Sequence, residues 1–346
     1  MRSDSLLVVF SAGMIAVVLA MVMVIQILLV RMSWNRSDAF EKAAEKKWSG
    51  ILAGVLSGHR SQPIPTLAKI ERLPFMRVWL HLHASIRGDS ATVLNAVALQ
   101  LGCDKVARNI LLRGDRQMQI VGILVSGCLK DKNAWQSLVP LIASPNSIVS
   151  MQAASAMLKI DGPVAMQHIM EMTFDRTDWS IADVAHMLQP IRHMYTTAAL
   201  AGLMSQSPRR MLRALRLLQA LKAVVPLSIV EALLHQPNID LKVAALRIAA
   251  CSGLREVIKK HGHDVEWPVR VAVAKAMRQV GTIDDLWLLK NLAGDASWWV
   301  RYRAAEALVH LPALTQLHLQ VITQTSPDSV AQDILQRVIT ERDRHL

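Results

Sequence analysis

The chain has 346 residues, of which 52% are hydrophobic and 19% are charged, so it is too apolar to be a disordered protein. Four Phe, two Tyr and nine Trp are too few aromatic side chains for a β-sandwich or barrel, which needs them to fill the pleated surface. Three cysteines exclude a disulfide framework, and the formal net charge of +12 favours an acidic partner.

An apolar segment of 25 residues, from Leu6 to Val30, comes first in the chain. As a helix it would be about 37 Å long, which is enough to cross the ~30 Å hydrocarbon core of a bilayer. A cleaved signal peptide is the alternative, but its apolar core would be shorter, its start more basic, and a small-residue cleavage site would follow. We therefore predict a short N-terminal tail over 1–5 and one transmembrane helix over 6–30.

Basic residues after this segment set its expected orientation. Lys and Arg are more numerous over 31–48 than before the segment, and such a positive flank stays on the cytoplasmic side. We therefore expect a single-pass protein of the bacterial inner membrane, with its N-terminus outside and its repeat domain in the cytoplasm. The residues expected at the membrane interface are Arg31, Trp34, Arg36, Lys42, Lys46 and Lys47.

A juxtamembrane segment over 31–65 follows the apolar one. Between Phe40 and Leu56 its apolar residues recur at helical spacing, which predicts an amphipathic helix. Two interpretations of this helix remain open: it packs on the first repeat, which we favour, or it lies on anionic lipid. Pro63 and Pro65 break the pattern and mark the entry to the main domain.

A repeat of about 30 residues organises the rest of the chain. Similar nine-residue segments recur, as in Val269-Arg-Val-Ala-Val-Ala-Lys-Ala-Met277 and Val300-Arg-Tyr-Arg-Ala-Ala-Glu-Ala-Leu308. They begin at 149, 180, 210, 241, 269, 300 and 330, which are 28 to 31 residues apart. On a helical wheel the first, fifth, sixth and ninth residues fall on one face, which would be buried.

A second helix follows each segment. The sequence after Gly281, over Ile283–Leu292, is apolar at helical spacing, and so is the sequence after Gly162, where glycine suits the end of a helix. Each unit is therefore a helix–turn–helix that cannot bury its apolar face alone and must stack on its neighbours. The predicted fold is all-α: a right-handed α-solenoid of stacked helix–turn–helix repeats after one N-terminal transmembrane helix.

These segments resemble the HEAT-repeat family, in particular the short bacterial repeats also seen in phycobilisome lyase-type proteins. Asp264 before Val269-Arg270, and Asp295 before Val300-Arg301, match the D-x4-V-R signature of that family. The resemblance covers 115–346, and 66–114 would form divergent N-terminal cap repeats. It implies a ladder of contacts between adjacent units, a role that Lys242 only approximates. The residues to which the resemblance gives this ladder role are Asp264, Arg270, Asp295 and Arg301.

Motifs for catalysis or metal binding are few. The chain has no nucleotide-binding loop, hydrolase elbow or paired-cysteine motif. The His81-x-His83 pair would diverge on a helix, and His261-Gly-His263 precedes Asp264, which has the ladder role already. The three cysteines stand far apart among apolar residues, which favours core packing over catalysis. We therefore expect no enzyme activity, no catalytic residue, no metal site and no cofactor.

Cations recur at one position of the repeat. The seventh residue of each segment lies opposite the buried face, and it reads Ser155, His186, Arg216, Arg247, Lys275 and Glu306. Arg216, Arg247 and Lys275 would therefore form a line on the concave surface, flanked by Arg213 and Arg303. We interpret this line as a basic stripe that binds the acidic surface of a protein partner. An ordinary solvated face is the alternative.

Tryptophans concentrate near the C-terminal repeats. Trp298 and Trp299 directly precede Val300, so at least one of them must project from the start of its helix. Packing between repeats is the favoured interpretation of these residues. The alternative is an aromatic hot spot that binds the same partner, because exposed Trp is enriched at interfaces.

Three classes of function fit these features. The first, which we favour, is a membrane-tethered interaction scaffold or accessory subunit of an inner-membrane complex, such as one for envelope polysaccharide synthesis or transport. Its partners would be the bilayer, through 6–30, and an acidic protein surface. The second is a HEAT-like enzyme, either a bilin lyase or a DNA glycosylase. The third is direct binding of anionic lipid or nucleic acid by the stripe, although nucleic acid is not expected because an anchor holds the domain away from DNA.

Overall fold

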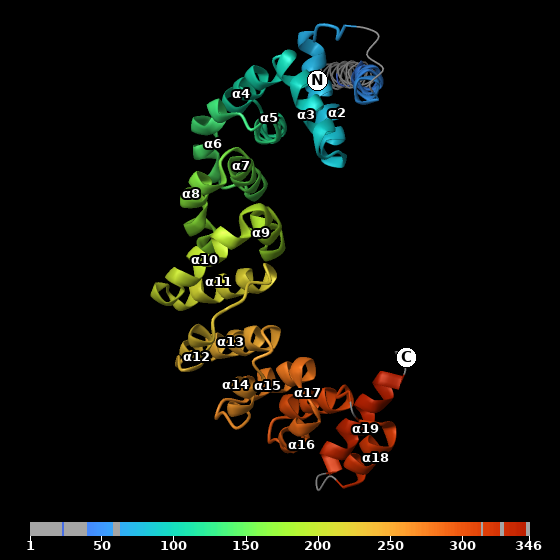
Figure 1. Ribbon diagram of the computed structural model, residues 1–346, viewed down its shortest axis with the longest axis vertical. Coiled ribbons are helices and arrows are strands. Elements are labelled where there is room, and N and C mark those ends of the chain that lie inside the picture. The colour runs from blue at the N-terminus through green and yellow to red at the C-terminus, as the bar shows by residue number, and fades with distance from the viewer. Residues whose placement is uncertain (1–22, 24–39, 58–62, 313, 326–328, 344–346) are drawn as a thin grey trace, which may run out of the picture. The chain divides into compact units, whose positions relative to one another are not determined.

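The computed structural model describes residues 23, 40–57, 63–312, 314–325 and 329–343 (Figure 1). Within these residues every regular element is a helix, so the predicted all-α fold is confirmed for this part of the chain. Apart from Met23, the predicted transmembrane helix over 6–30 lies outside the described residues, as do Arg31, Trp34 and Arg36. Among the helices that are described, none has the length and apolar character needed to cross a bilayer.

Two compact units make up the chain: an N-terminal unit over 1–162 and a C-terminal unit over 163–346. In the N-terminal unit, residues 40–56 are helical and short 3-10 helices occur at Lys69–Glu71 and Lys132–Ala134. Its further helices are α2 (Arg72–Ser85), α3 (Asp89–Gln100), α4 (Cys103–Arg113), α5 (Arg116–Leu129), α6 (Trp135–Ile142) and α7 (Ser147–Ile160). The last of them contains the first clear copy of the repeated segment.

The helix over 40–56 packs inside the N-terminal unit. Its residues Trp48 and Leu52 are fully buried, and the Trp48 ring meets Phe75 of α2 edge to face with 4.9 Å between ring centroids. Lys46 and Lys47 are both exposed, and Lys47 donates to Glu71 Oε1 at 2.8 Å. The apolar face of this helix therefore packs against the rest of the unit. This confirms the favoured interpretation, in which the helix packs on the first repeat, and contradicts the alternative, in which its apolar face lies on lipid.

The C-terminal unit contains six helix pairs, each an even-numbered helix followed by an odd-numbered one. Odd-numbered helices carry the repeated segments, and α11, α13, α15, α17 and α19 pack on one another in turn (Figure 1). The pairs are α8 (Gly162–Asp175) with α9 (Ile181–Leu188), α10 (Arg192–Gly202) with α11 (Pro208–Ala220), α12 (Leu227–Leu234) with α13 (Ile239–Cys251), α14 (Arg255–Lys260) with α15 (Trp267–Val280), α16 (Leu286–Ala293) with α17 (Trp298–Val309), and α18 (Gln316–Gln324) with α19 (Ser329–Asp343). Short 3-10 helices lie at Gln189–Ile191, Leu203–Ser205 and Ile283–Asp285.

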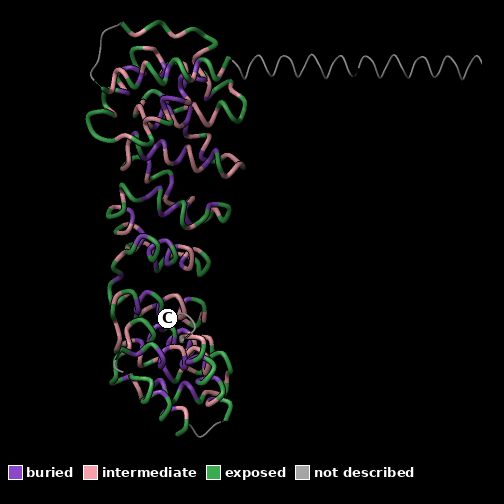
Figure 2. The backbone as a smooth tube through the Cα atoms, turned by 90° about the vertical axis from the view of Figure 1, so that its right-hand side faces the viewer, coloured by how far each residue is buried: buried purple, intermediate pink, exposed green. Residues whose placement is uncertain are grey.

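Burial follows the predicted wheel. In α15 the first, fifth, sixth and ninth residues of the segment are buried, and the same four positions are buried in α13 and α17 (Figure 2). Alanines such as Ala274 and Ala305 at the sixth position let neighbouring helices approach closely. The predicted stack of helix–turn–helix repeats is therefore confirmed, while the right-handed sense of the solenoid stays a prediction.

Gly281 ends α15, as expected, but for a different physical reason. Its φ is −66°, an angle that any residue adopts, so a left-handed backbone does not require glycine here. Instead, a Cβ atom at this position would lie 2.4 Å from the carbonyl oxygen of Met277 and 3.3 Å from a methyl group of Leu311. A side chain here would clash with the last turn of α15 itself, whereas Leu311 of the next repeat would have to move by only a few tenths of an ångström.

Candidate interaction surface

The three central cations of the predicted stripe lie on three consecutive packed helices. Arg216 is on α11, Arg247 on α13 and Lys275 on α15, and all three side chains are exposed. Capping side chains and prolines fix the residue at which each helix begins. The start of the helix in turn sets the direction of the seventh residue of the repeated segment. Asn238 caps α13 by accepting from the Leu241 amide at 3.1 Å, and a proline occupies the first turn of α11 and of α15.

No carboxylate of the described residues forms an ion pair with Arg216, Arg247 or Lys275, although neighbouring cations in the same unit are paired. The pKa of Lys275 is lowered, first by partial burial and then by the positive charges of Arg303 and Arg247, while Glu306 opposes the shift. Lys275 therefore feels the positive charges of Arg247 and Arg303, besides the cost of its partial burial.

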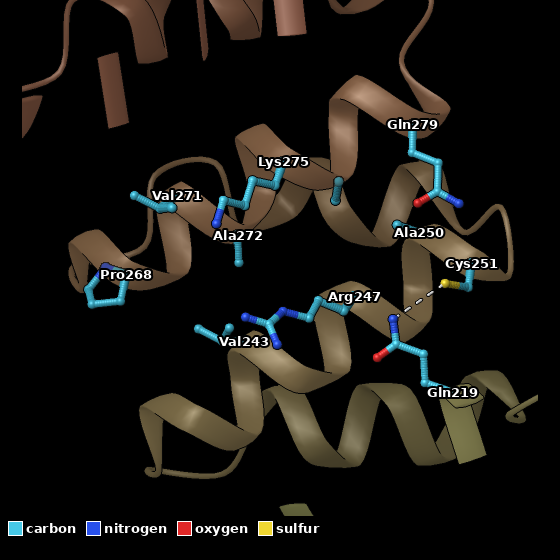
Figure 3. A pocket seen from close by; sticks show the side chains of 11 residues that line it. Gln219, Val243, Arg247, Ala250, Cys251, Pro268, Val271, Ala272, Lys275 and Gln279 are labelled. Carbon is cyan, nitrogen blue, oxygen red and sulfur yellow. Dashed lines mark hydrogen bonds between the residues drawn. The ribbon is translucent and has the colours of Figure 1, made fainter. Parts of the chain in front are cut away.

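A pocket of about 200 Å³ lies between α13 and α15 in the middle of this line. Arg247 enters it from α13 and Lys275 from α15, and valine and alanine side chains form its apolar floor (Figure 3). The amides of Gln219 and Gln279 line its far end together with the thiol of Cys251, and Gln219 Nε2 lies 3.9 Å from the sulfur. The pocket thus combines two cations, two amides and an apolar wall.

The two residues predicted to flank the stripe are engaged inside the fold. Arg213 is half-buried, and its Nε and Nη2 atoms donate to the carbonyl oxygens of Thr173 and Trp179 at 2.6 and 2.7 Å. Arg303 Nη1 donates to Glu306 Oε2 at 2.6 Å. The sequence pattern does not reveal the partners of Arg213, because they are carbonyl oxygens on α8 and in the turn before α9, whereas the partner of Arg303 is an acidic residue three positions further along its own helix.

Both tryptophans at the start of α17 are exposed, Trp298 to 44% and Trp299 to 52%, so they are not packed between repeats as we favoured. Trp298 stacks on Tyr302 with 5.3 Å between ring centroids and meets Trp299 edge to face at 4.9 Å. At the equivalent position of α15, Trp267 is exposed to 47%. Exposed tryptophans therefore mark the starts of α15 and α17.

The residues of the implied ladder meet along the turns between repeats. Arg270 on α15 donates from Nε and Nη2 to both carboxylate oxygens of Asp295, at 2.6 and 2.9 Å, and so ties its repeat to the next one. Lys242 Nζ lies 3.3 Å from Asp264 Oδ2 and makes the same connection one repeat earlier. Arg301 Nε donates to the carbonyl oxygen of Asp295. The contacts of Arg270 and Lys242 thus join adjacent units, as the HEAT resemblance implied for the ladder, whereas this bond of Arg301 stays within its own repeat.

Both ladder carboxylates have a lowered pKa. For Asp295, burial acts in the opposite direction, but hydrogen bonds from Arg270 and from the Ser297 amide outweigh it. For Asp264, burial again opposes the shift, while the Glu266 amide and Lys242 favour the ionised form. These aspartates are therefore held as carboxylates by their structural contacts.

The cysteines differ in their surroundings. Cys103 is buried, and burial raises its pKa to about 12; burial also raises the pKa of Cys128. Cys251 is exposed, which contradicts the expected core packing, because it ends α13 at the rim of the pocket. Among the residues that the structure covers, no three His, Cys, Asp or Glu side chains converge as metal ligands would.

Comparisons with known proteins add little to this geometry. No protein-family model matches the chain, and no curated protein matches it. One similar solved structure is the complex of CpcE and CpcF of phycocyanin lyase from Nostoc sp. PCC7120, with 14% identity, 80% of this chain and 97% of that chain covered, and a TM-score of 0.27. A TM-score this low supports no conclusion about activity, so the repeat fold rests on the helix pairs described above.

Proposed function

We propose that the chain is an interaction scaffold, tethered to the bacterial inner membrane through 6–30, whose basic stripe binds an acidic surface of a protein partner. The stripe consists of Arg216, Arg247 and Lys275. The observation that supports this proposal is that three unpaired cations occupy the same position on three consecutive helices. The partner would belong to a membrane complex, for example one for envelope polysaccharide synthesis or transport, with the repeat domain in the cytoplasm as its accessory subunit.

Electrostatics favours a binding role over an ordinary solvated face. Unlike charges on the surface of this unit are placed next to each other, as in the pairs of Arg210 with Glu171 and Asp175. Around Lys275 like charges gather instead: its pKa is lowered by partial burial first and then by the positive charges of Arg303 and Arg247. An acidic surface would relieve that repulsion and would speed association by steering the encounter.

Charge reversal tests the proposal. The full-length variant R216E/R247E/K275E should lose capture of its partner in a crosslinking pull-down from native membranes, and should keep its helical circular dichroism. K290E is the matched control, because Lys290 is an exposed cation on α16, in the other row of helices. Capture that survives the triple variant would overturn the proposed role of the stripe.

Direct binding of phosphate groups is the second candidate, because the same cations would bind anionic lipid or nucleic acid. The salt dependence distinguishes the two candidates. For a phosphate polymer, the logarithm of the binding constant falls steeply and linearly with the logarithm of the salt concentration. A protein partner with apolar contacts keeps much of its affinity as salt rises. The enzymatic alternatives, a bilin lyase or a DNA glycosylase, remain proposals that an activity assay on the purified protein would test.

A further inference from the structure

The pocket between α13 and α15 has a charged end and a polar end. Figure 3 shows the side chains of Arg247 and Lys275 reaching toward one end, whereas the amides of Gln219 and Gln279 and the thiol of Cys251 lie at the other. Alanine, valine and proline side chains complete the lining, and no Asp or Glu is among the described residues that line it. The pocket therefore offers an anion two positive charges and no carboxylate that competes for them.

The charges around this pocket leave its two cations without an internal counter-ion. The pKa of Lys275 is lowered, first by partial burial and then by the positive charges of Arg303 and Arg247, although the negative charge of Glu306 opposes the shift. Glu306 itself is held by Arg303, at 2.6 Å, and its other carboxylate oxygen lies 3.7 Å from Arg278. A ligand that brings two negative charges therefore matches Arg247 and Lys275, whereas a ligand with one charge leaves one cation uncompensated.

Both negative charges belong on one chemical group. Arg247 and Lys275 line the same cavity of about 200 Å³, and the charge of Arg247 acts on Lys275. A phosphate monoester carries a charge of about −1.5 to −2 near pH 7 and three acceptor oxygens. The planar guanidinium donates to two of these oxygens, and the ammonium group donates to the third. A single carboxylate brings one charge and two oxygens, so a phosphate monoester is the better match.

The rest of the pocket limits the body of the ligand. A volume of about 200 Å³ is below the roughly 300 Å³ at which sites for drug-sized ligands begin, so the ligand is small. The apolar wall suits a short carbon chain, and the amides of Gln219 and Gln279 donate to and accept from hydroxyl groups. A short hydroxylated carbon chain therefore fits between the cations and the amides.

We infer that this pocket binds the phosphate monoester of a small hydroxylated molecule. The phosphate lies between Arg247 and Lys275, and the hydroxyl end points toward Gln219 and Gln279. This ligand goes beyond the proposed scaffold function and does not depend on it. The same chemistry occurs in a free polyol phosphate and in a lipid headgroup that carries a phosphate monoester beside a free hydroxyl group.

Calorimetric titration of the full-length protein in detergent tests the site. The probe is glycerol 3-phosphate, and R247Q/K275Q should weaken its binding about tenfold or more, because contacts to two charged donors are lost. K290Q is the matched control and should leave binding unchanged, because Lys290 is an exposed cation on α16 that does not line the pocket.

Glycerate is the second probe, because it has a similar hydroxylated body with a carboxylate in place of the phosphate. It should bind more weakly than glycerol 3-phosphate, since it brings only one charge, and uncharged glycerol should not bind. Equal affinity for glycerate and glycerol 3-phosphate would overturn the inferred phosphate group. Equal affinity of R247Q/K275Q and the unmodified protein for glycerol 3-phosphate would overturn the inferred site.

The thiol of Cys251 gives a readout within the pocket. Iodoacetamide, which is uncharged, should modify the exposed Cys251 in preference to Cys103 and Cys128, because burial raises the pKa of both other thiols. Glycerol 3-phosphate at saturation should slow modification of Cys251 several-fold, as measured by mass spectrometry of the digested protein. An unchanged rate with the ester bound would place the ester outside this pocket and would overturn the inference.

The same readout distinguishes the two sources of the phosphate group. Protection of Cys251 by glycerol 3-phosphate supports a free ester as the ligand. Protection only by micelles that contain lysophosphatidic acid, and its loss in R247Q/K275Q, supports a lipid headgroup; lysophosphatidylcholine is the control, because its phosphate is a diester. Failure of both monoesters to protect Cys251 overturns the inference, whereas capture of the partner by R216E/R247E/K275E bears only on the scaffold function.

Discussion

Cations occupy two positions on the same helices of the C-terminal unit, and they meet opposite environments. At the second position of the segment, Arg270 is bound by both oxygens of Asp295 and Lys242 by Asp264. At the seventh position, Arg247 and Lys275 have no such partner among the described residues. Five residues along a helix therefore separate a cation that joins two repeats from a cation to which we assign a binding role only as a proposal.

The difference shows that a basic residue becomes structural when it can reach an aspartate in the turn between repeats. Asp264 and Asp295 lie in turns that precede the next helix, where the second residue of a segment reaches them and the seventh does not. A paired, partly buried cation stabilises the stack, since loss of its partner leaves a charge without compensation. An exposed cation at the seventh position, without a carboxylate partner among the described residues, adds little stability. In our proposal, an acidic partner relieves its repulsion from neighbouring cations.

The largest expected effect follows from breaking the ladder. D295A leaves the guanidinium of Arg270, whose side chain is 16% exposed, without its two-point partner. We expect a loss of about 2–3 kcal/mol in the free energy of unfolding, measured by denaturant titration of the full-length protein. D284A is the matched control, because Asp284 is 72% exposed, and it should change stability by less than about 0.5 kcal/mol. Equal effects of the two variants would contradict a structural role for the ladder.

Acid should weaken the ladder selectively. The pKa values of Asp264 and Asp295 are lower in the folded protein than the ordinary value of 3.8, so folding favours their ionised forms. Their contribution to stability is present above that ordinary value and is lost as the pH falls through the lowered pKa. Thermal melts between about pH 5 and pH 2 should therefore show a shallower decline for D295N than for the unmodified protein. Parallel curves would show that this carboxylate is not stabilised by folding.

A smaller effect separates two arginines on α11. R213A removes the donor that binds the carbonyl oxygens of Thr173 and Trp179, and should cost about 1.5 kcal/mol of stability. R216A removes an exposed side chain without an internal partner and should leave stability within about 0.5 kcal/mol. In the pull-down the order should reverse, with R216A reducing capture more than R213A. Comparable losses of stability for both would remove the distinction between the two positions.

The smallest effect concerns the stripe in the free protein. K275Q removes a charge that is repelled by Arg303 and Arg247, so stability should stay the same or rise by up to about 0.5 kcal/mol. The gain should shrink at high salt, because screening already weakens the repulsion between exposed charges. A marked loss of stability in K275Q would show that Lys275 has a structural role like that of Arg270.

By itself the sequence determined the repeat and its phase. Alanines and branched residues at fixed intervals specify which face of each helix is buried, because helical periodicity is a local property. All four positions are buried in α7, α13, α15 and α17, whereas the first position, Ser180 or Arg210, is not buried in the two copies between α7 and α13. The same phase placed Arg216, Arg247 and Lys275 on the exposed face. The D-x4-V-R signature carried the resemblance that implied a ladder role for Arg270 and Asp295, and the structure identified these two residues as a pair.

Only the tertiary structure decided which polar and aromatic side chains have partners. The partners of Arg213 are carbonyl oxygens on α8 and in the turn before α9, 40 and 34 residues away in the sequence. The repeat pattern does not predict contacts of this kind. Exposure of Trp298, and of Cys251 at the rim of a pocket, likewise depends on how far the neighbouring repeat extends over each helix end. Helix phase is set by adjacent residues, whereas pairing and exposure are set by residues that folding brings together.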